Sequence, residues 1–501
     1  MQKILRKRVL RDLKHNFVRY LALGLLIALG MYVVISVAGA AETVMERVDE
    51  NAENNHLEDG QFSVFTPLTD DEKKEITDKG ITLEPMFYLE YSCDDESSVR
   101  IFKNRQDVDL IQLDEGQLAH KDNDIVLEKR YCQEHEIKLN SYVKIGEKTY
   151  KVTGTGSTPD YDAPLKSMSD SSVNSKEFGT GFVNNATYNS LLKAGDSEKA
   201  EEYVYSYILN GKMTDDEFKD HLKTLKVTIP GQCETDNLTQ FTKAEDNPRI
   251  KASSDDQSIN KSAGLLIGII MLILFTYVIS VFVIHGIDRE SSVIGALYAL
   301  GVRKKELIMH YISLPVIITF IFGIMGTVTG YSKAGINVQI QDCYDYYSVP
   351  DFSTYYSAFL IVYGVIMPPV IAAIVNYFVI RKRLSRTALS LIKNEHKTKS
   401  VKNIKLGNMG FIGRFRIRQI IRESRTGLTI CFGMFISLFI LMLGLNCYVQ
   451  CNYISTQTPA DTKYEYMYMY KYPDKNVPDG GQAGYAKTFK KEVKGYNLIL
   501  H

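Results

Sequence analysis

The stretch Arg289–Ile308, RESSVIGALYALGVRKKELI, lies between two long apolar runs, SAGLLIGIIMLILFTYVISVFVIH (262–285) and LIMHYISLPVIITFIFGIMGTVTG (307–330). A helix needs about 20 apolar residues to cross a hydrocarbon core of roughly 30 Å, and each run is long enough. We therefore predict that Arg289–Ile308 connects two membrane spans. Its small residues and mixed charges predict a short helix rather than an unstructured loop.

Apolar runs of this length recur along the 501-residue chain, which is too long for one ordinary domain. The first run, 21–41, exceeds the apolar core of about 7–15 residues that signal peptides have, so we interpret it as a retained anchor. The predicted chain begins with an amphipathic helix (1–20), a first span (21–41) and a domain beyond the membrane (42–261). A membrane domain (262–380) follows, and it contains spans 263–284, 307–330 and 358–380, a connecting helix (287–301) and an outer loop (331–356). After it come a basic linker and amphipathic helix (381–426), a fifth span (427–449) and the start of a second outer domain (450–501).

Charge gives the predicted orientation. The chain carries 59 Lys and Arg residues against 59 Asp and Glu residues, but basic residues outnumber acidic ones by 7 to 1 in 1–20 and by 14 to 2 in 381–426, whereas acidic residues outnumber basic ones in 42–261. Flanks rich in Lys and Arg stay in the cytoplasm. We therefore predict a multi-pass plasma-membrane protein with a cytoplasmic N-terminus, an extracellular domain at 42–261, and Arg289–Ile308 in the cytoplasm.

The N-terminal pattern occurs twice. Leu5, Val9, Leu13 and Phe17 recur every four residues among basic side chains, which predicts a helix lying in the membrane interface before the first span. A similar basic, amphipathic segment begins at Phe415 and runs into the fifth span. We expect one whole unit of four spans followed by the opening of a second unit.

Segment 42–261 alternates between strand-like and helical patterns. The fold class we predict is a polytopic α-helical membrane protein, with about five transmembrane helices and a large mixed α/β (α+β) extracytoplasmic domain between the first two. Residues 157–176 are polar and rich in turn formers, which predicts a mobile loop. The predicted elements include strands Ile125–Glu128, Tyr142–Ile145 and Thr149–Thr153, helix Lys129–Glu136, a turn at Gly146–Glu147, a strand within 201–209, and a helix whose N-cap is Thr214.

Motifs for several chemistries are absent from the sequence. It has no G-x-x-x-x-G-K-[ST] phosphate loop, no H-E-x-x-H and no G-x-S-x-G. The 7 cysteines form no C-x-x-C pair or Cys/His cluster, so no zinc site is predicted. Ionisable residues near the middle of the spans, which ion-coupled carriers need, are also missing. We therefore expect no catalysis, no cofactor and no metal, and no nucleic-acid partner.

The connecting helix has two predicted edges. Val293, Leu297 and Leu300 form an apolar edge, while Gly295, Ala296 and Ala299 form a low-profile face that a protein surface could approach closely. Gly301 is expected to end the helix, and Arg303, Lys304 and Lys305 to open the next one. The pattern suits either a lever moved by a partner or a loop that packs only against lipid.

The same stretch resembles the signature of FtsX-like permeases, the membrane subunits of MacB-type ABC transporters, in which this loop reads approximately R-x-x-E-I-G-x-L-x-A-L-G-A-x-x-x-x-I. Val293 stands where that family often has glutamate, and the nearest acid is Glu290. Residues 125–156 are similar to the MacB-type extracytoplasmic core, with Glu147 in place of an aspartate. The matching residues of the loop are Arg289, Ile294, Gly295, Leu297, Ala299, Leu300, Gly301 and Ile308.

The resemblance implies that 262–380 is an FtsX-like permease domain and 42–261 a MacB-type domain. A separate cytoplasmic ABC ATPase subunit would bind ATP, dock on the coupling helix and drive movement of the outer domain. This movement would export or extract a lipid, peptide or lipoprotein, or control a cell-envelope process. The partners implied are this ATPase, membrane lipid, and a second permease unit or the chain's own missing C-terminal half. The alternative is a membrane-anchored sensor of extracellular peptides or antibiotics that does not transport. The residues implied in ATPase coupling are Arg289, Glu290, Val293, Ile294, Gly295, Ala296, Leu297, Ala299, Leu300, Gly301, Arg303 and Lys304.

Overall fold

The chain forms two compact units in the computed structural model, 1–395 and 396–501. The predictions for 1–20, 381–426, 427–449 and 450–501 lie largely outside the described residues, although 441–454 are helical. The structure describes residues 11, 13–170, 172–228 and 234–384 of the first unit, and residues 412, 413, 416, 431, 434, 435, 438, 439 and 441–454 of the second.

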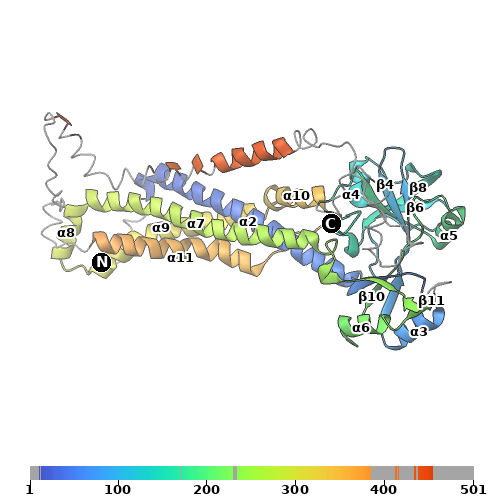
Figure 1. Cartoon of the computed structure of the whole chain (residues 1–501). Coiled ribbons are helices and arrows are strands. Elements are labelled where there is room, and N and C mark those ends of the chain that lie inside the picture. Colours follow the sequence, from blue (N-terminus) through green and yellow to red (C-terminus); the bar gives the residue numbers. More distant parts are fainter. Residues whose placement is uncertain are drawn as a thin grey trace. The chain divides into compact units, whose positions relative to one another are not determined.

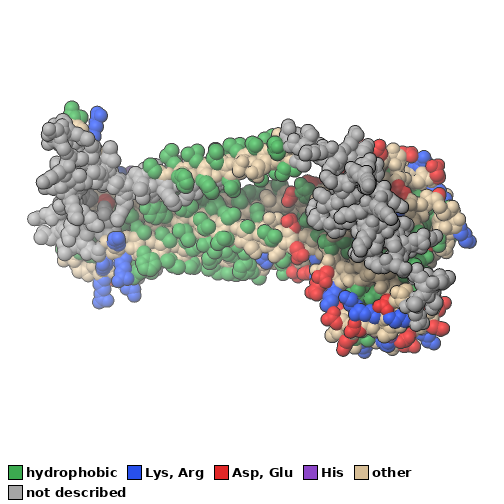
Figure 2. Space-filling view, in the orientation of Figure 1, with side chains coloured by type: hydrophobic (Ala, Val, Ile, Leu, Met, Phe, Trp, Pro, Cys, Tyr) green, Lys and Arg blue, Asp and Glu red, His purple; other side chains and the backbone are tan. Residues whose placement is uncertain are grey.

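Four of the described helices are long and apolar enough to cross a membrane. They contain the first four predicted spans, which are therefore confirmed as helices of spanning length. Hydrophobic side chains cover the visible face of these helices, and charged side chains gather over the α/β region (Figure 2). The four helices are α2 (Phe17–Asn54), α7 (Ala252–Arg289), α9 (Lys304–Gly330) and α11 (Ala358–Arg383).

The four helices pack side by side, each against two main neighbours, in the cyclic order α2, α9, α11, α7 (Figure 1). A continuous apolar cluster, with Ile35, Leu272 and Leu360 among its buried members, fills the space between them. Close approach depends on small residues, as it commonly does between membrane helices. A Cβ atom on Gly326 of α9 would lie 2.6 Å from the carbonyl oxygen of Ala28 in α2.

Helices α2 and α7 are longer than a membrane requires. Each has 38 residues, so at 1.5 Å per residue each is about 57 Å long, against a hydrocarbon core of roughly 30 Å. Outside the apolar part, Lys261 Nζ of α7 lies 2.8 Å from Glu42 Oε1 of α2, and Lys251 Nζ lies 2.7 Å from Asp49 Oδ1. The two helices therefore continue as an ion-paired stalk into the α/β region.

The α/β region lies between α2 and α7 in the chain and has two lobes. In the first lobe, the sheet β13-β1-β10-β2 packs against α3 and α6 around Phe62, Ile76 and Phe218. In the second, a seven-stranded mixed sheet, β3-β4-β9-β6-β8-β5 with β7 paired to β8, packs against α4 and α5 around Tyr131 and Tyr188. Because both β1 and β13 belong to the first lobe, the chain enters and leaves the region through it.

The elements of the region are short. The hairpin β11-β12 stands apart from both sheets. The helices are α3 (Asp70–Asp78), α4 (Lys129–Glu134), α5 (Asn185–Ala194) and α6 (Asp215–Leu222), with turns η1 (Pro159–Tyr161) and η2 (Ala244–Asp246). The strands are β1 (Gly60–Val64), β2 (Thr82–Pro85), β3 (Tyr88–Ser92), β4 (Ser98–Lys103), β5 (Gln112–Gly116), β6 (Asp124–Glu128), β7 (Tyr142–Ile145), β8 (Lys148–Ser157), β9 (Phe178–Val183), β10 (Tyr203–Ile208), β11 (Lys226–Thr228), β12 (Glu234–Asp236) and β13 (Leu238–Lys243).

Several local predictions for this region are confirmed. Strands β6 and β7, helix α4 and the start of β8 lie where the sequence places them, with helix α4 two residues shorter. Thr214 caps α6 in a capping box, since Glu217 N donates to Thr214 Oγ1 and Thr214 N donates to Glu217 Oε2. These signals are local in sequence, which explains why sequence reasoning finds them.

The loop between α9 and α11 is structured. It contains a π-helical turn η3 (Lys333–Asn337) and helix α10 (Val338–Tyr346). Ile336 and Ile340 pack against Val44 and Val48 of α2. The loop therefore covers the side of the stalk.

Candidate functional site

Helix α8 (Ser291–Ala299) connects α7 to α9, and its start differs from the prediction. The expected coupling helix covers 287–301, but α7 continues to Arg289 and the chain bends at Glu290 before α8 begins. The serine pair 291–292 follows the bend, and serine is a weak helix former. Gly301, in the left-handed region at φ 85°, ends the helix as expected.

The two faces of α8 differ in exposure. Ile294 and Gly295 are buried, whereas Val293 is 48% and Leu300 75% exposed. Gly295 therefore lies on the inward side, and the low-profile face predicted from it is formed instead by Ala296 and Ala299. Of the twelve predicted coupling residues, Arg289, Val293, Ala296, Ala299, Leu300, Gly301, Arg303 and Lys304 are exposed, Glu290 and Leu297 are half-buried, and Ile294 and Gly295 are buried.

Helix α8 is attached to three of the long helices. Its backbone continues from α7, with the Ile294 amide donating to the carbonyl oxygen of Glu290. Tyr311 Oη of α9 donates to Glu290 Oε2 at 3.1 Å. Tyr298 Oη donates to the carbonyl oxygen of Leu384, just after α11, also at 3.1 Å. A force applied to the exposed face of α8 therefore acts on α7, α9 and α11 together.

At the other end of α7, a short buried segment joins this helix to the α/β region. We call residues 157–165, which contain η1, the joint strap. Sequence reasoning assigns them to a mobile loop, but all nine are buried. The carboxylate Oδ2 of Asp162 accepts hydrogen bonds from the amide and hydroxyl of Ser253, both at 2.9 Å. Asp162 therefore supplies the N-terminal cap of α7 from a distant part of the chain.

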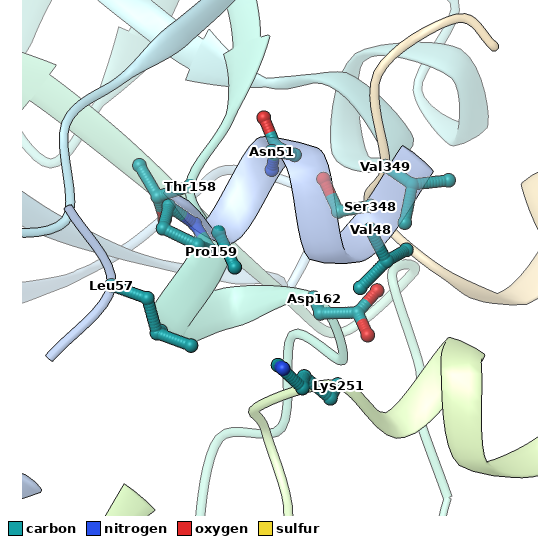
Figure 3. A pocket seen from close by; sticks show the side chains of 10 residues that line it. Val48, Asn51, Leu57, Thr158, Pro159, Asp162, Lys251, Ser348 and Val349 are labelled. Atoms are coloured by element: carbon teal, nitrogen blue, oxygen red, sulfur yellow. The ribbon is translucent and has the colours of Figure 1, made fainter. Parts of the chain in front are cut away.

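A cavity of about 10 Å³ lies beside the joint strap. This volume has room for about one water molecule. Its lining comes from the end of α2, the joint strap, the start of α7 and the loop after α10 (Figure 3). Among the described residues, Asp162 Oδ1 and Thr158 Oγ1 are buried without a hydrogen-bond partner. Burial raises the pKa of Asp162 to about 7, against the hydrogen bonds from Ser253, which lower it.

A second group of buried carboxylates lies at the same joint. Arg105 donates two hydrogen bonds to Asp160 of the joint strap, at 2.5 and 2.8 Å. Asp109 and Glu58 are also buried, and the Glu58 amide donates to Asp109 Oδ1 at 3.0 Å. Burial, then the charge of Asp160, raises the pKa of Glu58 to about 7, and burial also raises that of Asp109. This carboxylate cluster links both lobes to the joint strap, because Ser206 of β10 donates to Glu58.

The loop after α10 is bound to the second lobe by basic side chains of α4. Lys129 Nζ lies 2.8 Å from Asp351 Oδ1 and 3.5 Å from Asp114 Oδ1. Arg130 Nε donates to the carbonyl oxygen of Asp345 at 2.7 Å. Movement of α9 or α11 can therefore reach the α/β region through this loop as well as through α7.

Sequence reasoning did not single out the joint. Its carboxylates look like solvated acids in a polar stretch, and their partners Arg105 and Ser253 are more than 50 residues away. One signal was present: Tyr161 stands between Pro159 and Pro164, an unusual composition for a mobile polar loop. The described residues contain no group of three or more His, Cys, Asp or Glu side chains arranged to hold a metal ion.

Comparison with family models finds no match to this chain, and comparison with curated proteins finds no relative.

Proposed function

We propose that this chain is the membrane-spanning permease subunit of an ABC transporter of the FtsX-like, MacB-like class. A separate cytoplasmic subunit binds and hydrolyses ATP and docks on the exposed face of α8. The resulting movement passes through the four-helix bundle to the α/β region on the extracellular side of the plasma membrane. Movement of the α/β region there drives export or extraction of a lipid, peptide or lipoprotein, or controls a cell-envelope process.

One observation carries this proposal: α8 presents a shallow exposed face and is attached to α7, α9 and α11 at once. Val293, Ala296 and Leu300 leave that face apolar and low, which suits close packing by a protein surface. A loop that only contacts lipid has no need of the hydrogen bonds from Tyr298 and Tyr311. Those two bonds hold α8 in place when it is pushed.

Helix α7, which connects α8 to the α/β region, supports the same proposal. Helix α7 is one unbroken element from Ala252 to Arg289, so displacement at one end is transmitted to the other with little loss (Figure 1). Its first turn is fixed to the joint strap by Asp162. The bundle interior that lies among the described residues is largely apolar. This favours mechanical work on the outer side over passage of a polar cargo between the helices.

The test is co-purification of the tagged chain from its native membrane in mild detergent. We expect a stoichiometric partner with a phosphate-binding loop, and nucleotide hydrolysis that the chain stimulates. Ala296→Trp places a large side chain on the docking face and is expected to lower association at least tenfold. Ala186→Trp, on the exposed side of α5, is the matched control and keeps it.

Two results would contradict the proposal. In the first, Ala296→Trp retains full association and stimulated hydrolysis. In the second, the folded wild-type chain brings no such partner. That second result would favour the membrane-anchored sensor, whose outer domain binds a peptide without transport.

A further inference from the structure

The first turn of α7 depends on a side chain from outside the helix. Lys251, at the N-cap position, lies in the left-handed region at φ 53° and makes no side-chain cap. The Asp162 carboxylate takes that role, and its residue is only 4% exposed. The carbonyl oxygen of Asp162 also accepts from the Ser348 amide at 2.9 Å, and the Ala163 amide donates to the carbonyl oxygen of Arg249. Asp162 is therefore central to the attachment of α7.

The charges around Asp162 do little to neutralise it. On α7, Asp255 repels it. On α10 and the loop after it, Cys343 and Tyr347 face both Asp162 and Asp256. Lys251 lines the cavity, but its Nζ is paired with Asp49 of α2.

Two effects on the Asp162 carboxylate therefore oppose each other. The helix dipole and the two hydrogen bonds from Ser253 favour the ionised form. Burial beside the small cavity disfavours it, and Oδ1 has no partner among the described residues. Arg249, next to the joint strap, directs Nε to the carbonyl oxygen of Leu165 rather than to Asp162.

We propose that Asp162 is a proton-operated latch between α7 and the α/β region. The protonated carboxyl stays buried and holds the joint strap on α7, whereas the ionised carboxylate favours opening of the joint to water. Attachment of α7 thus depends on the pH of the compartment that the α/β region faces. The latch acts whether or not a nucleotide-binding subunit docks on α8.

The expected size follows from linkage. In an open joint, the carboxyl group returns to its ordinary pKa of 3.8, whereas the closed joint raises this pKa to about 7. Closure is therefore favoured most below pH 3.8 and is weakened as the pH rises through about 7. Between pH 3.8 and about pH 7, the ratio of open to closed joint rises by up to about tenfold per pH unit. From pH 5 to pH 8 the total rise in this ratio is about a hundredfold.

Hydrogen–deuterium exchange of the purified full chain in detergent tests the latch. The reporter is the first turn of α7, residues 252–256. The internal reference is the first turn of α5, whose cap is the amide side chain of Asn184, which does not titrate and accepts from the Thr187 amide at 2.7 Å. We expect the exchange ratio of reporter to reference to rise by up to about a hundredfold from pH 5 to pH 8.

Asp162→Asn keeps an acceptor for Ser253 and removes the titration, so the ratio is expected to stay flat with pH. Ser253→Ala removes a donor that stabilises the charge, so the midpoint of the rise moves to higher pH. Glu58→Gln is the control for the neighbouring carboxylate cluster and leaves the rise at α7 in place.

Identical pH profiles for wild type and Asp162→Asn would overturn the latch. If Asp162→Asn does not fold, an unmoved midpoint in Ser253→Ala overturns it instead.

Discussion

Replacing Glu58 by glutamine is expected to stabilise the α/β region at neutral and alkaline pH, although it removes a charged residue from a hydrogen-bonded cluster. Glu58 is 3% exposed and lies with Asp109 and Asp160, while Arg105 forms its ion pair with Asp160 and donates to the backbone carbonyl of Asp109. Three buried carboxyl groups therefore share one guanidinium. Glutamine keeps the shape and the polar contacts to Ser206, and it carries no charge.

The magnitude follows from the pKa of Glu58, which burial raises from 4.5 to about 7. A group with a raised folded pKa contributes stability that is complete below its ordinary value and is lost as the pH rises through the folded value. The shift corresponds to about 3 kcal/mol at most, because each pKa unit is worth about 1.4 kcal/mol. We expect Glu58→Gln to be about 1–3 kcal/mol more stable than wild type at pH 8, and no more stable at pH 4.5.

Hydrogen exchange at the β1–β10 pair measures this effect, since the Asp59 amide there donates to the carbonyl oxygen of Tyr207 at 2.9 Å. The free energy of opening in wild type should fall between pH 5 and pH 8, and the fall should be smaller in Glu58→Gln. Glu147→Gln, at an exposed turn, is the matched control and should behave as wild type. An equal fall in wild type and Glu58→Gln would refute the reasoning.

Two further predictions concern helix packing and attachment of the loop after α10. Gly326→Ala places a Cβ atom 2.6 Å from the carbonyl oxygen of Ala28, so the free energy of unfolding of the bundle should fall by about 1–3 kcal/mol in thermal or denaturant unfolding. Gly286→Ala is the control, because a Cβ atom there meets nothing within 4 Å, and equal effects of the two substitutions would contradict the packing. Lys129→Met leaves the half-buried Asp114 without its cation, so the free energy of opening measured by amide exchange at 349–353 should fall by about 1–3 kcal/mol. Unchanged exchange at these residues would contradict the attachment of the loop to the second lobe through Lys129.

The first four spans and much of the second lobe could be predicted because their signals are local. Twenty consecutive apolar residues predict a helix in a membrane, since a helix satisfies its backbone hydrogen bonds within one segment. The pattern from Ile125 to Thr153 and the capping box at Thr214 likewise need only neighbouring residues. Gly301 ends α8 because its left-handed conformation favours glycine.

The tertiary structure alone decided which face of α8 is free and what the joint strap does. Gly295 and Ala296 are both small residues, but packing against the long helices buries the first and leaves the second exposed. The predicted loop 157–176, which contains the joint strap, is polar overall, and polar side chains are normally solvated. Asp160 and Asp162 are buried nonetheless, because Arg105 pairs with the first and Ser253 donates two hydrogen bonds to one oxygen of the second, and both partners are remote in the chain. Burial of a charged group is decided by partners that the local sequence does not contain.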